Sequence, residues 1–247
     1  MKKIFLIFLL SNFITPSIAQ DAKDIVMKAD QKMRGESSIV EITMKIIKPE
    51  WDREISIKTW NKGTKLALIL LTAPARDKGA VFLKRDKEVW NWLPSIERVV
   101  KIPPSMMMQS WMGSDFTNDD LVKQSSIIVD YEHEIVGDST IAGKECYKIL
   151  FTPKPDAPVV WGKIYSWIAK DDPMQLRVEY YDEDGYLVNI LQMSDIKEMD
   201  GREIPTRMEM IPVEKEGNKT IMIYKSISFN EKIEESFFSQ QNMKRIR

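Results

Sequence analysis

The sequence predicts a mainly β protein with a few helices, an α+β fold of the sandwich or barrel type. Three observations predict this class. About a dozen short segments between residues 38 and 230 alternate apolar with polar side chains, as half-buried strands do. Turn dipeptides such as Asp184-Gly185 and Asp200-Gly201 separate these segments in the manner of antiparallel hairpins. No helix-length segment lies between them, which disfavours a parallel sheet built from βαβ units.

Residues 1–19 have the composition of a secretory signal peptide. Two lysines precede an unbroken apolar run over residues 4–10, and Ser17 and Ala19 are the small residues expected before a cleavage site. The run is too short to span a membrane, and the alternative interpretation is a buried N-terminal helix. We expect cleavage after residue 19, and we expect residues 20–247 to form a single domain because they contain no flexible linker.

Composition narrows the compartment and the partners. The chain has one cysteine and one histidine, and its formal net charge is −1. A lone cysteine cannot form an internal disulfide, so an exported chain of this kind points to a bacterial periplasm. Basic and acidic residues are mixed without a basic stripe, so the sequence gives no indication of a nucleic-acid partner.

The segment that follows the expected cleavage site predicts a helix. Its apolar side chains recur every fourth residue, at Ile25, Ala29 and Met33. Asp21 or Asp24 can cap the start of this helix, and Gly35 can end it in a left-handed conformation.

Most of the remaining chain predicts strands. One face of the first strand, residues 38–48, is expected to carry Val40, Ile42, Met44 and Ile46. Further strands are expected before the chain midpoint at residues 53–60, 64–74, 79–85, 88–94 and 97–103. The second half predicts strands at residues 126–137, 144–153, 159–170, 174–185, 186–201, 203–213 and 219–230.

A methionine-rich segment interrupts the strands. Pro104 suits the first turn of a helix and Gly113 suits its end, so residues 105–112 are expected to form about two helical turns. Apolar side chains would cover most of the circumference of this helix, which is more than one buried stripe requires. We therefore expect a plug or lid over a cavity, with ordinary core as the alternative. Thr117 and Asp120 have capping-box spacing for a second short helix.

The residue inventory disfavours most enzyme chemistry. His133 lies between glutamates on the expected polar side of a strand, where a solvated or ion-paired histidine is the simplest interpretation. Cys146 lies within a strand and is interpreted as a small core residue. Zinc sites need several His or Cys residues, and no glycine-rich phosphate loop precedes a helix. Asp115, Asp119 and Asp120 lack EF-hand spacing and are interpreted as capping residues, so we expect no metal and no cofactor.

Several stretches of the chain resemble a known group of proteins. These stretches are LLTAPARDKGAVFLKRDKEVWNWLPSIERVVKIPPSMMMQSWMGSDFTNDDLV, YSWIAKDDPMQLRVEYYDEDG and SISFNEKIEESFF. Their most specific parts are Trp90-x-Trp92-Leu93-Pro94 and Gly113-Ser114-Asp115-Phe116. Together they resemble the outer-membrane lipoprotein-sorting protein group of the LolA-like superfamily, over essentially the whole chain after the leader.

The resemblance implies a curved, incompletely closed antiparallel β-barrel whose concave face is covered by helices, with a hydrophobic cavity between the two layers. It implies a non-enzymatic periplasmic carrier that binds the acyl chains of a lipid or lipoprotein during envelope transport or sorting, with transient contact to a membrane surface. Combined with the methionine segment, it gives the expected cavity and lid residues: Trp90, Trp92, Met106, Met107, Met108, Trp111, Met112 and Phe116.

Two other functions stay open from the sequence. The chain could be an accessory subunit that docks onto an inner-membrane transporter for efflux or lipid export, with the methionine segment as an interface anchor. It could also be an enzyme that acts on envelope lipid through paired carboxylates, because a sequence does not show the separation of such groups.

Overall fold

The computed structural model of the chain describes residues 21–122, 126–157 and 159–246. The expected signal peptide, residues 1–19, lies outside the described residues, and its cleavage stays a prediction. Across the described ranges, no helix is both long enough and apolar enough to cross a membrane.

The described strands form one thirteen-stranded antiparallel sheet, which confirms the mainly β prediction. The sheet order is β6-β5-β4-β3-β2-β1-β13-β12-β11-β10-β9-β8-β7, so β6 and β7 are its two edges and the sheet does not close. The strands are β1 (Ser37–Ile47), β2 (Asp52–Lys62), β3 (Leu66–Ala73), β4 (Val81–Arg85), β5 (Glu88–Leu93), β6 (Arg98–Lys101), β7 (Tyr131–Ile141), β8 (Lys144–Pro153), β9 (Lys163–Ala169), β10 (Gln175–Tyr181), β11 (Leu187–Met199), β12 (Arg202–Pro212) and β13 (Lys219–Phe229).

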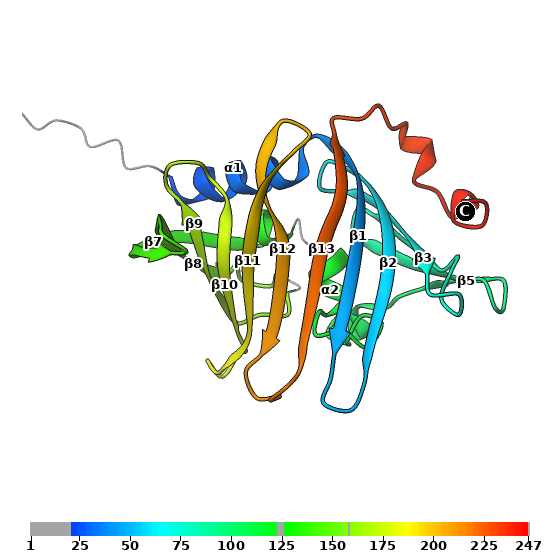
Figure 1. The fold of residues 1–247 in the computed structure, drawn as a ribbon, viewed down its shortest axis with the longest axis horizontal. Coiled ribbons are helices and arrows are strands. Elements are labelled where there is room, and N and C mark those ends of the chain that lie inside the picture. The colour runs from blue at the N-terminus through cyan, green and yellow to red at the C-terminus, as the bar shows by residue number, and fades with distance from the viewer. Residues whose placement is uncertain (1–20, 123–125, 158, 247) are drawn as a thin grey trace, which may run out of the picture.

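The first and last strands meet at the centre of the sheet. β1 pairs with β13 in a register that places Ser38 opposite Phe229. From this centre, one series of hairpins runs outward to β6 and the other runs outward to β7. Figure 1 shows the resulting curved sheet, with α1 and α2 behind its strands.

The helices are short except for the first. They are α1 (Ala22–Arg34), η1 (Pro104–Met106), α2 (Asn118–Val122), α3 (Ser126–Val129), η2 (Glu235–Phe237) and α4 (Gln240–Met243). The predicted caps of α1 are confirmed, because Asp21 accepts a hydrogen bond from the Lys23 amide at 3.0 Å and Gly35 has φ 67°. The expected strand over residues 126–137 is wrong at its start, since residues 126–129 are helical and β7 begins at Tyr131.

The concave face of the sheet carries the main core. In β1 the predicted alternation is confirmed, with Met44 and Ile46 fully buried on this face. The side chains of Ile25, Val26 and Ala29 on α1 pack into the same core. Helix α1 therefore covers part of the concave face, as its apolar stripe requires.

The convex face is covered over part of its area by the C-terminal segment. Strand β3 reads as a continuous apolar run because it is buried on both sides: Ile69 and Leu71 face the concave core, and Leu68 and Leu70 face the convex one. Phe238 and other side chains of residues 233–246 fill that convex layer.

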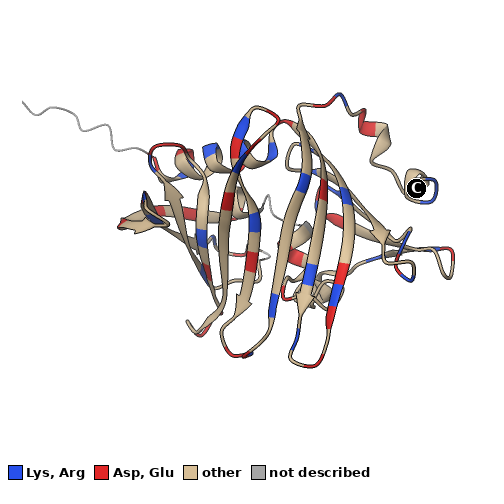
Figure 2. Cartoon of the chain, in the orientation of Figure 1, with Lys and Arg blue, Asp and Glu red and all other residues tan. Residues whose placement is uncertain are grey.

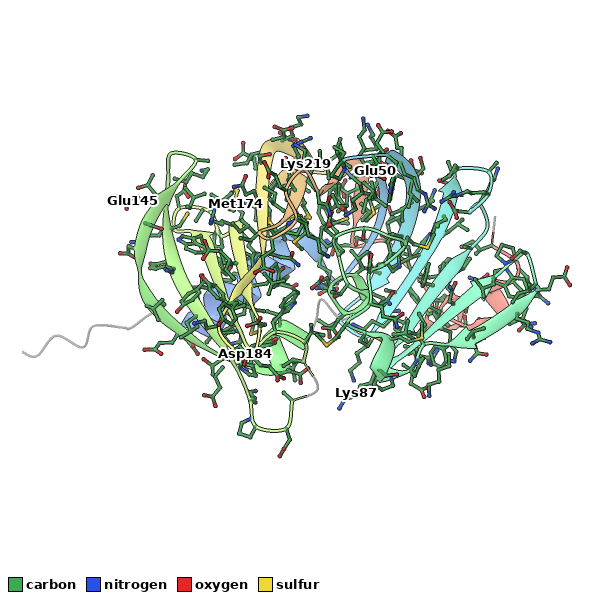
Figure 3. All side chains as sticks on the ribbon, turned by 90° about the horizontal axis from the view of Figure 1, so that it is seen from below. Glu50, Lys87, Glu145, Met174, Asp184 and Lys219 are labelled. Atoms are coloured by element: carbon green, nitrogen blue, oxygen red, sulfur yellow. The ribbon has the colours of Figure 1, made fainter. Side chains whose placement is uncertain are left out.

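The segment between the two edge strands crosses the open side of the sheet. Because β6 and β7 are consecutive in the chain but lie at opposite edges, the chain between them passes from one edge to the other. We call its described residues, 102–122 and 126–130, the link. Seen from below in Figure 3, the strands form an arch with the link on its inner side. Charged residues of both signs are mixed along the strands in Figure 2, without a face of one sign.

Candidate functional site

A cavity of about 220 Å³ lies between the concave face of the sheet, α1 and the link. Its walls are mostly aliphatic and aromatic, and they come from elements that lie far apart in the sequence. Five of its lining residues are methionines: Met33, Met44, Met193, Met208 and Met222. Flexible, polarizable methionine side chains suit a wall that must fit ligands of different shapes.

None of these five methionines was among the cavity and lid residues expected from the sequence. Met33 belongs to α1, and the others belong to β1, β11, β12 and β13. Each strand methionine occupies an inward position of a period-two pattern, so the alternation did contain a signal. What the sequence lacked was the order of the strands, which decides that these positions face one cavity.

The methionine segment departs from the predicted helix. Only Pro104–Met106 form a short 3₁₀ turn, and residues 107–117 fold back on themselves. The Trp111 amide donates to the Phe116 carbonyl at 2.8 Å, and Ser110 bridges to Thr117. Because Met112 and Gly113 both have positive φ, at 55° and 82°, the chain turns here instead of continuing a helix.

This turn separates the expected lid residues. Trp111 and Phe116 line the cavity, and Trp111 is only 1% exposed. Met107 packs in a separate small cluster with Val89, and Met112 lies at the margin of the main core. The other two, Met106 and Met108, are exposed to solvent, Met108 by 65%.

The far side of the turn is fixed to the centre of the sheet by Asp115. Its carboxylate accepts from the Lys48 ammonium at 2.5 Å and from the Thr220 hydroxyl at 2.7 Å. The Asp115 amide in turn donates to the Thr220 hydroxyl at 2.9 Å. The Asp115 side chain is 4% exposed, so this pair is shielded from water. We call these three residues the latch.

The predicted capping box is confirmed. The Thr117 amide donates to Asp120 at 2.8 Å, and the Asp120 amide donates to the Thr117 hydroxyl at 3.0 Å. The other carboxylate oxygen of Asp120 accepts from the Trp161 indole nitrogen at 3.1 Å. Burial of Asp120 raises the pKa of its carboxyl group.

Asp120 belongs to a polar end of the cavity. The Tyr131 hydroxyl donates to the Trp161 carbonyl at 3.2 Å, and the Tyr180 ring lies 5.0 Å from the Trp161 ring. Asp119, which is also buried, lines the cavity beside Asp120. We call these residues the polar end: Asp119, Asp120, Tyr131, Trp161 and Tyr180. Sequence reasoning interpreted the aspartates only as caps.

A second polar group lies at the C-terminal end of α1. Arg34 pairs with Asp30, with 2.6 Å between Nη2 and Oδ1. The Asn61 amide donates to the Thr59 hydroxyl at 3.2 Å, and all four side chains line the cavity. The opposite charges of Arg34 and Asp30 compensate each other, so this end presents hydrogen-bonding groups with no net charge.

Trp90 and Trp92 lie on the opposite face from the cavity, which corrects the expectation that they line it. Trp92 is buried in the convex core with Phe238 and Met243, and Trp90 packs against the same core. The alternation in β5 correctly placed both tryptophans on one face. It could not show that this face is convex, because the covering segment comes from the other end of the chain.

Cys146 and His133, the cysteine and the histidine of the chain, are both at least partly buried. Cys146 is a free, fully buried cysteine, which confirms its interpretation as core. His133 is half-buried and not a solvated surface residue: its Nε2–H donates to the Ile127 carbonyl at 3.0 Å, and its ring packs edge-on against Phe151. Burial lowers the pKa of His133. Its role is therefore to tie the link to β7.

Solved structures share this architecture. A DUF1329 family protein from Desulfovibrio piger aligns with a TM-score of 0.82 at 24% identity, covering 90% of this chain and 97% of its own. A LolA superfamily protein from Nitrosomonas europaea aligns with a TM-score of 0.79 at 19% identity, covering 91% and 100%. A Vibrio parahaemolyticus domain described as an outer membrane lipoprotein-sorting protein aligns at 0.80 and 20%, covering 91% and 98%. At these identities the likeness shows the fold.

Sequence comparison gives the family. No curated protein matches the chain at a significant level. A protein-family model whose description reads "Uncharacterized protein" matches residues 63–245, which is well over half of the chain. The chain therefore belongs to this DUF1329-like family, and its fold is that of the LolA superfamily.

Proposed function

We propose that the protein is a non-enzymatic periplasmic carrier that binds the acyl chains of a lipid or lipoprotein in its cavity during envelope transport or sorting. The observation that carries the proposal is the cavity itself, an apolar space walled by five methionines under a curved sheet. Burial of one acyl methylene contributes about 0.8 kcal/mol, so a chain of about ten methylenes gains roughly 8 kcal/mol before the costs of association. The LolA superfamily fold supports the same function.

The size of the cavity implies that the link moves when a ligand enters. Its volume of about 220 Å³ lies below the range of roughly 300–1,000 Å³ that is typical of ligand pockets. The Trp111 indole nitrogen is buried without a hydrogen-bond partner among the described residues. A buried donor without a partner costs about 1–3 kcal/mol, which weakens the closed position of the link. Trp111 and Phe116 would then act as the lid residues.

Two single substitutions within the link test this function. The purified protein is loaded with an environment-sensitive hydrophobic dye or with phospholipid, and retention is followed by fluorescence and native mass spectrometry. Trp111→Ser should reduce retention at least tenfold because it removes a cavity wall of aromatic surface. Met108→Ser is the matched control in the same turn, and it should retain the ligand because Met108 is exposed. Equal retention by both variants, with native circular dichroism, would contradict the lid assignment.

A second function is favoured by the outer surface of the link. Met106 and Met108 are exposed apolar side chains on either side of the buried Met107. Such a surface suits docking onto an inner-membrane transporter or transient contact with a membrane surface. Cross-linking from position 108 in a membrane fraction distinguishes the two: a single transporter subunit supports docking, whereas lipid adducts alone support contact with the bilayer. The docking function predicts that Met108→Ser loses the transporter, while dye retention, which depends on the cavity, is kept.

A further inference from the structure

Tyr180 stands out at the polar end of the cavity. It is 6% exposed, and it lines the cavity from β10. Its hydroxyl has no hydrogen-bond partner among the described residues, although buried hydroxyl groups in proteins nearly always have one. A ligand or a water molecule must therefore supply that partner.

None of the hydrogen bonds that its neighbours make involves the Tyr180 hydroxyl. The Trp161 indole donates to Asp120, and the Tyr131 hydroxyl donates to the Trp161 carbonyl. The two oxygens of Asp120 accept from Trp161 and from the Thr117 amide. These hydrogen bonds fix Trp161, and the Tyr180 ring lies 5.0 Å from the Trp161 ring with its hydroxyl outside this set of bonds.

The chemistry of this hydroxyl selects the kind of partner. Burial, together with the nearby Asp120 carboxyl group, raises the pKa of Tyr180 well above its ordinary value, so the group is a neutral donor. Asp119 and Asp120 line the same end. The polar end contains no basic side chain that could pair with an anionic ligand, and burial of a charge without a partner is costly. The ligand group that suits the Tyr180 hydroxyl is therefore a neutral hydrogen-bond acceptor.

We propose that the polar end binds the carbonyl oxygen of an ester- or amide-linked acyl chain, with the Tyr180 hydroxyl as donor. The inference rests on the proposed carrier function and refines it, because it states which part of the ligand lies at which end of the cavity. The hydrocarbon chain lies along the methionine walls. A free fatty acid is disfavoured, since its carboxylate would have no basic partner at the polar end.

Ligands of equal chain length test the inference. Four compounds are compared: an unbranched alkane, and the fatty-acid methyl ester, N-methylamide and carboxylate of the same chain length. Each is titrated into the purified protein loaded with a hydrophobic dye, and displacement of the dye measures its affinity. The ester and the amide should bind about five-fold more tightly than the alkane, the effect of one neutral hydrogen bond, and the carboxylate should bind more weakly than both. A stronger effect for the ester identifies a glycerolipid-type linkage, and a stronger effect for the amide identifies an N-acylated chain.

Two tyrosine variants locate the hydrogen bond. Tyr180→Phe removes only the hydroxyl and should abolish the five-fold preference while leaving alkane binding unchanged. Tyr224→Phe is the matched control, because Tyr224 also lines the cavity but lies near Arg34, at the end of α1, and not at the polar end. Loss of the preference in Tyr224→Phe but not in Tyr180→Phe would overturn the assignment. Equal binding of alkane and ester by the unmodified protein would overturn it too, since water would then satisfy Tyr180.

Failure of the carrier function gives a different result. In that case none of the four compounds displaces the dye from the unmodified protein. A spectroscopic measurement keeps the test independent of the variants. The carbonyl stretch of an isotope-labelled ester should shift to lower frequency when it is bound, as for a hydrogen-bonded ester, and an unshifted band would contradict the inference.

Discussion

The two faces of the sheet carry the same kinds of side chain but are covered in different ways. On the convex face, aromatic rings and aliphatic side chains of β3–β5 are met by Phe238 and Met243 of the C-terminal segment, which are fully buried. On the concave face, α1 and the link meet the strands only in part and leave about 220 Å³ open. Tryptophan and methionine are found on both faces.

The difference shows that residue type does not decide whether an apolar surface becomes core or cavity. The deciding factor is whether the backbone brings a matching surface close enough to exclude a void. The C-terminal segment is held against the convex face by polar contacts at its start and in its middle: Lys62 donates to the Ile233 carbonyl at 2.7 Å, and Arg85 donates to the Phe238 carbonyl at 3.1 Å. The link has its latch on one side of its turn and exposed methionines on the other.

The largest expected effect on the free energy of unfolding is found when a methionine is replaced by alanine on the convex face, compared with the same substitution on the concave face. Met243→Ala should destabilise the protein by about 3 kcal/mol, because Met243 is fully buried in the convex core with Phe238 and Trp92. Met193→Ala should cost only about 1–2 kcal/mol, since its side chain already borders a void. Denaturant unfolding measures both, with dye retention as a second readout. Equal losses of stability would mean that the concave face is packed as tightly as the convex one.

An intermediate effect is expected at the latch. Asp115→Asn leaves the Lys48 ammonium without its counter-charge in a shielded position, and it should cost about 2 kcal/mol and release bound dye faster. The matched control is Glu54→Gln, which breaks the exposed ion pair between Lys45 and Glu54 on the neighbouring strands. That variant should show no measurable loss of stability. A slower release of dye in Asp115→Asn would contradict the role of the latch.

The smallest expected effect is a pH dependence of the free energy of unfolding that comes from His133. Burial lowers the pKa of His133 below its ordinary value of 6.5, so the unfolded chain binds the proton more readily than the folded one. The stability from neutral His133 is therefore present above about pH 6.5 and is lost as the pH falls through and below that value. His133→Gln should flatten the unfolding free energy over that pH range. A slope that persists in the variant would assign it to other groups.

Much of the fold was predictable because it depends on local patterns. The cap at Asp21, the end of α1 at Gly35 and the capping box of Thr117 and Asp120 are set by neighbouring residues alone. The strands followed from alternation, which needs no knowledge of partners.

The site was less predictable because it depends on contacts between distant segments. Trp90 and Trp92 were expected in the cavity, but Phe238 arrives from the other end of the chain and covers their face. The helix expected over residues 105–112 is replaced by a turn because the chain folds back at Met112 and Gly113, and Thr220 and Lys48 hold Asp115 beyond it. For the strand methionines of the cavity wall, the alternation predicted only that they lie on one face of each strand; it did not show that these faces line a common cavity.

The pairing of β1 with β13 also sets the order in which the fold can be completed. Residues 38 and 229 are partners at the centre of the sheet, so this contact closes a loop of nearly the whole described chain. Sheets that depend on such distant pairings fold slowly. During synthesis β1 pairs with β2 on one edge, but its other edge has no partner until the last strand, β13, is made. A chain that stops before β13 would present the long edge of β1 to other chains, and aggregation is the expected fate of such truncated products.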